Sequence, residues 1–268
     1  MTRRGLFISA AILAATVVLA TSCAREDGAL FGIVVNEQKG YIDGSGKILI
    51  QPQFPTGSKF CEGRAAVQLK DEGPLGYIDR SGKIVVQPQF HYAGDFSEGL
   101  ARVQPAEDGP MGYIDQTGKI VIQPQFYGVG SFSGKLAAVM LIPNGQWGYI
   151  DQTGKMVIQP QFYDAYDFSG GLAGVRLKEG EPMGYVDRTG AIVIQPQFSR
   201  AGGFLEGLAA VQPDGGGPFG YIDRTGKMVI QPQFQRVLDF SCGLAFVMLF
   251  DVSWGYIDQA GKMIWRSE

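Results

Sequence analysis

The chain has 268 residues, of which 45% are apolar and 12% aromatic. This composition can bury a packed core, which excludes an intrinsically disordered chain. The formal net charge is −3, so the chain lacks the basic surface that would bind nucleic acid or an anionic membrane.

The N-terminal residues have the pattern of an export signal. Two arginines precede an apolar stretch from Leu6 to Ala20, and small residues then lead to Cys23. The stretch is short for a membrane span. Ala20 and Ser22 satisfy the small-x-small rule for cleavage after Ser22. The sequence therefore predicts a signal peptide over residues 1–22, and its removal would change the net charge from −3 to −5.

The segment around the cleavage point resembles a bacterial lipoprotein processing box. It reads Leu-Ala-Thr-Ser-Cys over residues 19–23, and in such boxes the cysteine is lipidated and becomes the new N-terminus. Ala24 follows the cysteine where aspartate would indicate retention at the inner membrane. We therefore expect a short linker over residues 23–28 with lipidated Cys23, located at the outer membrane. Ordinary cleavage, giving a soluble periplasmic or secreted protein, is the alternative.

A sequence of about 36 residues recurs through the rest of the chain. Its anchor is Gly-Tyr-Ile-Asp, with valine in place of isoleucine in the fifth copy. The anchors start at Gly40, Gly76, Gly112, Gly148, Gly184, Gly220 and Gly255. A fixed period of this size is typical of solenoids and propellers, whose units bury their apolar faces against neighbouring units. Residues 29–268 are thus predicted to form one domain of seven repeats.

The fourth copy shows how a repeat begins. Tyr149 and Ile150 point to opposite faces of a short strand, and Val157 and Ile158 do the same in the next strand. Between these strands, Asp-x-Ser/Thr-Gly predicts a type I turn that closes on a left-handed glycine. The aspartates that open these turns are Asp43, Asp79, Asp115, Asp151, Asp187, Asp223 and Asp258.

The repeat continues through Gln-Pro-Gln-Phe into a connector. Pro160 removes a ladder donor, so the strand must end there or lie at a sheet edge. Phe162, Ala165 and Phe168 then recur every three residues, which favours a turn or a single helical turn over a strand. Residues 171–177 alternate as a strand again. Each repeat is therefore predicted to be a three-stranded antiparallel meander with a packed connector.

The predicted fold class is all-β. Seven is a common number of propeller blades, although four-stranded blades typically take ~40–45 residues. No strand is visibly shared between the two ends of the array to close a ring. We predict a propeller-like ring, and an open β-solenoid or superhelix is the alternative.

The repeated residues resemble the bacterial WG-repeat family, also called KWG-type. The resemblance is carried by Trp147-Gly148-Tyr149-Ile150-Asp151, the Thr-Gly-Lys turn and the Phe-Ser-x-Gly-Leu-Ala connector, and it extends over nearly the whole mature chain. Tryptophan precedes the anchor glycine only at Trp147 and Trp254. The resemblance implies a β-repeat interaction scaffold, and it brings no catalytic residues.

The sequence offers little that suggests catalysis. The seven turn aspartates have equivalent positions, whereas paired catalytic carboxylates need contrasting environments. His91 is the single histidine, and its position varies between copies. No closely spaced cysteine pair suggests zinc. We therefore expect no enzyme activity, metal or cofactor. A glycosidase-like enzyme, with two carboxylates about 5–9.5 Å apart, is a minor alternative.

Two segments differ between copies and are therefore candidates for recognition. The segment after Gln-Pro-Gln-Phe is rich in tyrosine and arginine, which suit binding surfaces. The candidate binding residues are Tyr92, Tyr127, Tyr163, Tyr166, Arg200 and Arg236. The loop before each anchor is acidic, through Asp71, Glu72, Glu107, Asp108, Glu179, Glu181, Asp214 and Asp251. If equivalent loops share one rim, that rim is acidic.

These patterns predict an exported, lipid-anchored scaffold that binds a protein partner at the bacterial cell envelope. A carbohydrate- or peptidoglycan-binding module is the first alternative, and it would need tyrosines exposed along a groove. A purely structural envelope component fits the same residues. Nucleic acid is not expected as a partner, and the membrane is expected to be reached only through the lipid anchor.

Overall fold

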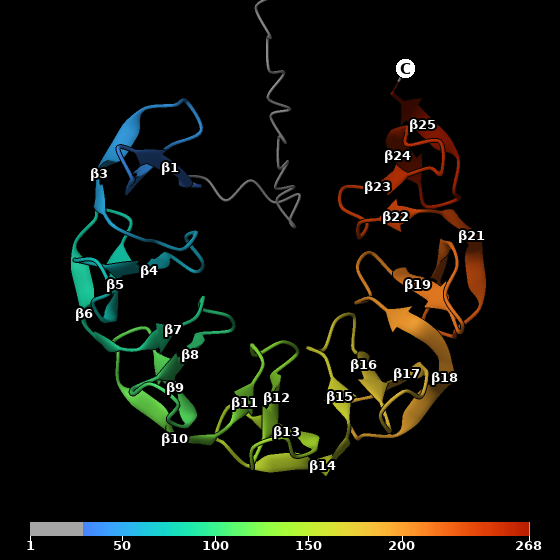
Figure 1. The fold of residues 1–268 in the computed structure, drawn as a ribbon, viewed down its shortest axis with the longest axis horizontal. Coiled ribbons are helices and arrows are strands. Elements are labelled where there is room, and N and C mark those ends of the chain that lie inside the picture. The colour runs from blue at the N-terminus through green and yellow to red at the C-terminus, as the bar shows by residue number, and fades with distance from the viewer. Residues whose placement is uncertain (1–28, 268) are drawn as a thin grey trace, which may run out of the picture.

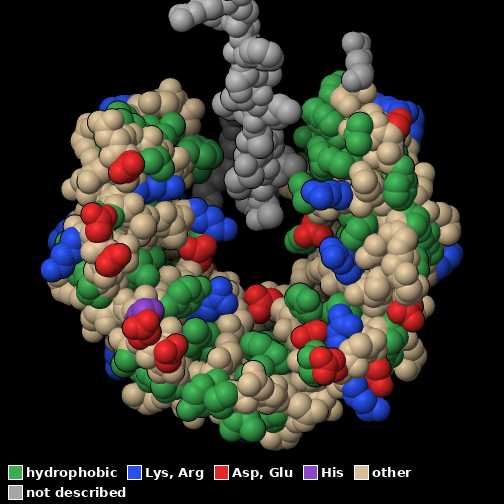
Figure 2. Space-filling model, viewed as in Figure 1, with side chains coloured by type: hydrophobic (Ala, Val, Ile, Leu, Met, Phe, Trp, Pro, Cys, Tyr) green, Lys and Arg blue, Asp and Glu red, His purple; other side chains and the backbone are tan. Residues whose placement is uncertain are grey.

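The computed structural model describes residues 29–267, which form seven blades around a central hollow (Figures 1 and 2). The regular elements of this part of the chain are β-strands. No helix in residues 29–267 is long and apolar enough to cross a membrane. The predicted signal peptide, the linker and Cys23 lie outside the described residues.

Three strands recur in every blade, numbered here as blades 1 to 7 in chain order. The first strands are β1 (Phe31–Val35), β4 (Arg64–Gln68), β8 (Leu100–Gln104), β12 (Leu136–Met140), β16 (Ala173–Arg176), β19 (Ala209–Pro213) and β23 (Leu244–Met248). The anchor strands are β2 (Gln38–Ile42), β5 (Leu75–Asp79), β9 (Met111–Asp115), β13 (Trp147–Asp151), β17 (Met183–Val186), β20 (Phe219–Ile222) and β24 (Trp254–Asp258). The outer strands are β3 (Ile48–Phe54), β6 (Ile84–Phe90), β10 (Ile120–Phe126), β14 (Met156–Phe162), β18 (Ile192–Ala201), β21 (Met228–Phe234) and β25 (Met263–Arg266). The predicted antiparallel meander is thus confirmed in all seven blades.

The connector adds a short inner strand that the sequence analysis did not predict. The inner strands are β7 (Tyr92–Ala93), β11 (Gly128–Val129), β15 (Asp164–Ala165) and β22 (Arg236–Val237). In blade 5 the N–H of Tyr163 donates to the carbonyl of Arg176, and the N–H of Tyr166 donates to that of Gly174. In blade 6 the same pairing is made by the C-terminal end of β18. This strand pairs first with β17 of blade 5 and then with β19 of blade 6.

The connector ends in a tight two-residue turn, so of the two predicted forms the turn is confirmed and the helical turn is not formed. Ser169 and Leu172 exchange backbone hydrogen bonds across this turn. The two residues between them, Gly170 and Gly171, have φ values of 57° and 86°. Two consecutive left-handed residues define a type I′ turn, whose twist matches the strands on both sides. Phe162 and Phe168 are buried and Ala165 is half-buried. The spacing of three therefore marks the packed residues of the connector and does not indicate a helix.

The outer strand explains why the anchor begins with glycine. The register between β13 and β14 shifts where Pro160 passes over Gly148. A Cβ atom at Gly148 would lie 2.5 Å from the carbonyl oxygen of Ile158 and 2.8 Å from the nitrogen of Pro160. Only glycine therefore allows this bulged crossing. β14 lies at the edge of its sheet, which confirms the predicted edge position of Pro160.

Each pair of neighbouring blades is joined by the anchor tyrosine. The Tyr149 hydroxyl donates a 2.7 Å hydrogen bond to the carbonyl of Tyr166 in the next blade. Its ring packs edge-on against Phe168, with 4.8 Å between the ring centroids. The same inter-blade hydrogen bond is made by Tyr41, Tyr77, Tyr113, Tyr185 and Tyr221. The hydrophobic clusters consequently lie between blades as well as within them.

The described blades form an open arc instead of a closed ring. Blade 1 and blade 7 face each other across the opening in Figure 1. No strand of blade 1 pairs with a strand of blade 7 within residues 29–267. The propeller-like arrangement of blades is therefore confirmed, and the expectation that no strand is shared between the ends holds for this part of the chain.

Candidate functional site

The two variable segments lie at the same end of each blade, which we call the loop face. In blade 5, Tyr163 pairs with Arg176, the last residue of the first strand β16. The loop before the anchor strand follows directly after this residue. The equivalent backbone pairing recurs in blades 3, 4 and 7, and the end of β18 makes a similar one in blade 6. The acidic loops and the segments after Gln-Pro-Gln-Phe of these blades therefore form one rim of the arc.

In blades 2, 3, 5 and 6 the acidic loop is fixed by a side chain at the end of the first strand. Gln104 donates from Nε2 to the carbonyl of Gly109 at 2.7 Å, and Arg176 donates to the carbonyl of Glu181 at 2.6 Å. Gln68 and Gln212 make the same contact in blades 2 and 6. The sequence analysis missed this clamp, although a long polar side chain recurring before these loops could have indicated it.

Tyr127 and Tyr163 occupy equivalent positions on the loop face of blades 4 and 5. Their side chains are 49% and 43% exposed, whereas the anchor tyrosine Tyr149 is fully buried. The negative charge of Glu179 is the main cause that raises the pKa of Tyr163. This effect shows that the acidic loop lies beside the tyrosine hydroxyl.

The other candidate binding residues are more scattered. Arg200 and Arg236 are exposed and pair with the ends of their first strands, so they also lie at the loop face. Tyr92, at the equivalent position, is half-buried, with the guanidinium of Arg102 5.7 Å from its ring centroid. Tyr166 is 53% exposed but lies further along the connector. The structure therefore brings five of the candidates to the loop face, four of them exposed and Tyr92 half-buried, and places Tyr166 away from them.

A groove opens on the loop face between blades 2 and 3. Its lining includes Gln68, Glu72, His91 and Glu107. Figure 2 shows the single histidine beside acidic side chains on this face. The groove is therefore polar and acidic. Within residues 29–267, no group of three or more His, Cys, Asp or Glu side chains is arranged to hold a metal ion.

The turn aspartates lie at the opposite end of each blade and are engaged within their own turns. Oδ1 of Asp151 accepts hydrogen bonds from the Thr153 hydroxyl at 2.6 Å and from the backbone N–H groups of Thr153 and Lys155. The hydroxyl is the main cause that lowers the pKa of Asp151. The same shift and cause recur at Asp43, Asp79, Asp115, Asp187 and Asp223. In the seventh turn Ala260 offers no hydroxyl, and Oδ1 of Asp258 accepts hydrogen bonds from the backbone N–H groups of Ala260 and Lys262.

The arrangement of strands defines an all-β, propeller-like repeat scaffold. The model of the WG containing repeat matches residues 40–72, 76–104, 111–141, 147–180, 183–216 and 219–249. The chain belongs to this family. The repeat anchored at Gly255 lies outside the matched ranges, yet it forms blade 7. No curated protein matches the chain.

The sequence repeat and the blade are out of phase. The match over residues 147–180 contains the anchor and outer strands of blade 4, followed by the inner and first strands of blade 5. Each sequence repeat therefore spans two blades, and the covalent chain itself ties every blade to the next.

Three solved structures show the likeness of fold. The computationally designed Ika8 protein is 14% identical, with 90% of this chain and 87% of that chain covered and a TM-score of 0.54. A structure titled as the eukaryotic initiation factor is 12% identical, with coverages of 89% and 73% and a TM-score of 0.58. BamB from Moraxella catarrhalis is 14% identical, with coverages of 89% and 84% and a TM-score of 0.53. Ika8 and BamB are β-propellers, so the likeness supports the propeller-like fold and carries no function at these identities.

The turn hydroxyls predict a pH-dependent contribution to stability. A lowered carboxyl pKa stabilises the folded state above the unfolded pKa and loses that contribution as the pH falls through the folded pKa. We expect Thr153→Ala to lower the melting temperature at neutral pH, and this loss to shrink below about pH 4. Thermal unfolding followed by circular dichroism across this pH range measures the effect. Ala260→Thr is the matched control and should stabilise at neutral pH, and a loss in Thr153→Ala that is independent of pH would contradict the account.

Proposed function

We propose that this protein is an exported, lipid-anchored scaffold of the bacterial cell envelope whose loop face binds a protein partner. The observation that carries the proposal is the exposure of Tyr127 and Tyr163 at equivalent positions of neighbouring blades, with the acidic loop beside Tyr163 held by a side-chain hydrogen bond from Arg176. The proposal assigns the chain a binding role and no catalytic one.

The division of residues within the repeat supports this proposal. The anchor tyrosine and its phenylalanine partner are buried between blades, where they pack against each other. Residues that differ between copies are free to contact other molecules, and on the loop face they include exposed tyrosines and arginines. Aromatic and arginine side chains are enriched at protein interfaces. Loops that are already ordered lose little conformational entropy on binding.

A protein partner fits the surface better than a glycan does. Sugar stacking would favour aromatic rings along a groove. The groove between blades 2 and 3 is lined by glutamine, glutamate, histidine, proline and small residues, without tyrosine. Its acidic side chains instead complement a basic segment of a partner.

The loop-face tyrosines provide the test of binding. We expect Tyr127→Ser with Tyr163→Ser to reduce capture of partner from envelope extract at least tenfold, because exposed aromatic anchors supply much of the binding free energy. The melting temperature should stay unchanged, since both side chains are exposed. Val157→Ser, an exposed apolar position on the outer strand β14, is the control and should retain capture. Equal capture by a folded double variant would reject this surface as the binding site.

The lipid anchor has a separate test. Cys23→Ser removes the thiol that would be acylated, so we expect the protein to move from the membrane fraction to the soluble fraction of the envelope. Immunoblotting of fractionated cells measures this partition. Unchanged membrane association would contradict lipidation at Cys23 while leaving the loop-face proposal intact.

A further inference from the structure

Every junction between blades joins two different apolar faces. We call the side of a blade that packs on the following blade its trailing face, and the opposite side its leading face. Between blades 4 and 5, the trailing face contributes Tyr149 and Ile158, and the leading face contributes Ala173, Val175 and Val186. The same two faces meet at all six junctions of the arc, so their complementarity is a repeated property of the chain.

Blade 7 exposes its trailing face. Leu244 is 37% exposed, whereas the equivalent Leu208 of blade 6 is 8% exposed. Trp265 is 50% exposed, whereas the equivalent Ile230 is 3% exposed. The hydroxyl of Tyr256 donates no hydrogen bond within residues 29–267, unlike that of every preceding anchor tyrosine.

Aromatic side chains enlarge this exposed face. Trp254 and Trp265 lie 4.9 Å apart between ring centroids, and Phe246 lies 5.6 Å from Trp254 and 5.9 Å from Tyr256. Ala210 occupies the position of Phe246 in blade 6. In the other blades the anchor tyrosine packs against a phenylalanine from the next connector, as Tyr221 does against Phe240 at 4.9 Å. In blade 7, Phe246 supplies an aromatic contact to Tyr256 from its own blade.

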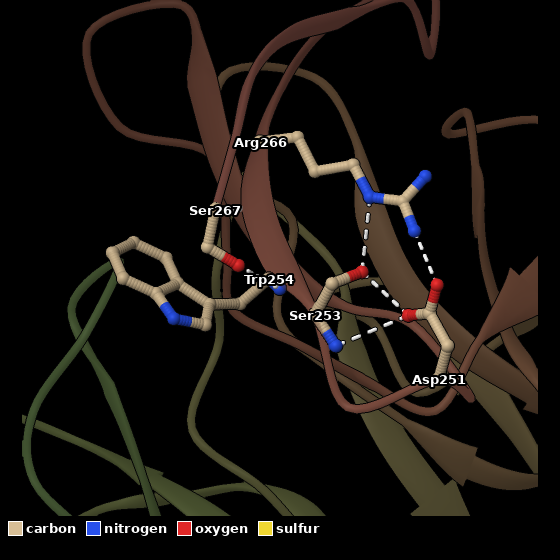
Figure 3. Close-up of polar contacts among 5 residues, drawn as sticks. All are labelled: Asp251, Ser253, Trp254, Arg266 and Ser267. Atoms are coloured by element: carbon tan, nitrogen blue, oxygen red, sulfur yellow. Dashed lines mark hydrogen bonds and ion pairs between the residues drawn. The ribbon is translucent and has the colours of Figure 1, made fainter.

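A polar network holds the outer strand of blade 7 in place without the Gln-Pro-Gln-Phe sequence. Nε of Arg266 donates to the Ser253 hydroxyl at 3.0 Å, and its guanidinium pairs with Asp251. The backbone N–H of Trp254 donates to the Ser267 hydroxyl at 3.0 Å. Figure 3 shows the Trp254 indole pointing away from the carboxylate and guanidinium groups. The aromatic face is thus an ordered surface.

Blade 1 exposes the complementary leading face. Phe31 is 51% exposed, whereas Ala65, at the equivalent position of blade 2, is 1% exposed. Ile33 and Ile42 are half-buried, and their equivalents in blade 2, Val67 and Ile78, are fully buried. Within residues 29–267, no other blade packs on this face, and no inner strand precedes β1.

We infer that the trailing face of blade 7 binds the leading face of blade 1 in a second copy of this chain. Such a contact repeats between molecules the junction that the chain makes six times within itself. Phe31 takes the place of a small alanine, which fits a junction where the described residues include no connector before blade 1 to fill the space. Because the two faces differ, the contact is heterologous and leaves one free face at each end, so assemblies extend head to tail.

The test disables each face separately. Phe31→Asp places a charge on the leading face, and Trp265→Asp places one on the trailing face. Both side chains are about half exposed, so each variant should fold. Val193→Asp, at an exposed position on the outer strand β18, is the matched control. The full chain is studied by sedimentation velocity in a density-matched mild detergent, over a range of protein concentrations, with circular dichroism to check folding.

We expect the unmodified chain and Val193→Asp to form concentration-dependent oligomers. Phe31→Asp and Trp265→Asp should each remain monomeric alone. An equal mixture of the two should form dimers and nothing larger, because only one intact pair of faces remains. Monomers of the unmodified chain at every concentration would overturn the inference. Dimers of Phe31→Asp alone or Trp265→Asp alone would also overturn it, since they would show that like faces pair.

Discussion

The fold depends on one contact, the buried anchor tyrosine that donates its hydroxyl to a carbonyl of the next blade. Burial raises the pKa of these tyrosines, to about 12 at Tyr41, so the hydroxyl stays a donor at all physiological pH values. A buried hydroxyl without a partner would cost about 1–3 kcal/mol, which makes the neighbouring blade a requirement for each tyrosine. The edge-on phenylalanine adds to the same junction. A blade of about 36 residues is too small to bury its own apolar faces, so the junctions determine the stability of the array.

This dependence divides the residues of each repeat by role. Positions that recur in every copy form the junction, the turn or the crossing of the outer strand, and the tyrosine and phenylalanine of the junction are buried. Positions that vary gather at the loop face, where Tyr127 and Tyr163 are exposed and Tyr163 lies beside an acidic loop. The two end blades carry a third kind of surface, because their outward faces are junction faces that no other blade within residues 29–267 covers. The scaffold therefore offers a rim for a partner and two ends for association.

Much of the fold could be predicted from the sequence because the repeat constrains it seven times. The hairpin, the edge position of Pro160 and the turn role of Asp151 each follow from local chemistry that the sequence displays. The inner strand could not be predicted, since two residues are too few to show a strand period. The separation of Tyr166 from Tyr163 was equally hidden, because it depends on how the connector pairs with the first strand. The loop clamp from Gln104 depends on a contact across five residues of irregular chain, and its one signal in the sequence is the long polar side chain that recurs before these loops.

The most direct test of this account is the free energy of unfolding of Tyr149→Phe, measured by urea denaturation beside Tyr256→Phe. Both substitutions remove one hydroxyl from equivalent anchor positions, but only Tyr149 uses it to bind the next blade. The account predicts a loss of about 1–2 kcal/mol for Tyr149→Phe and a change within about 0.5 kcal/mol for Tyr256→Phe. Equal losses in the two variants, or no loss in Tyr149→Phe, would show that the inter-blade hydrogen bond does not hold the array together.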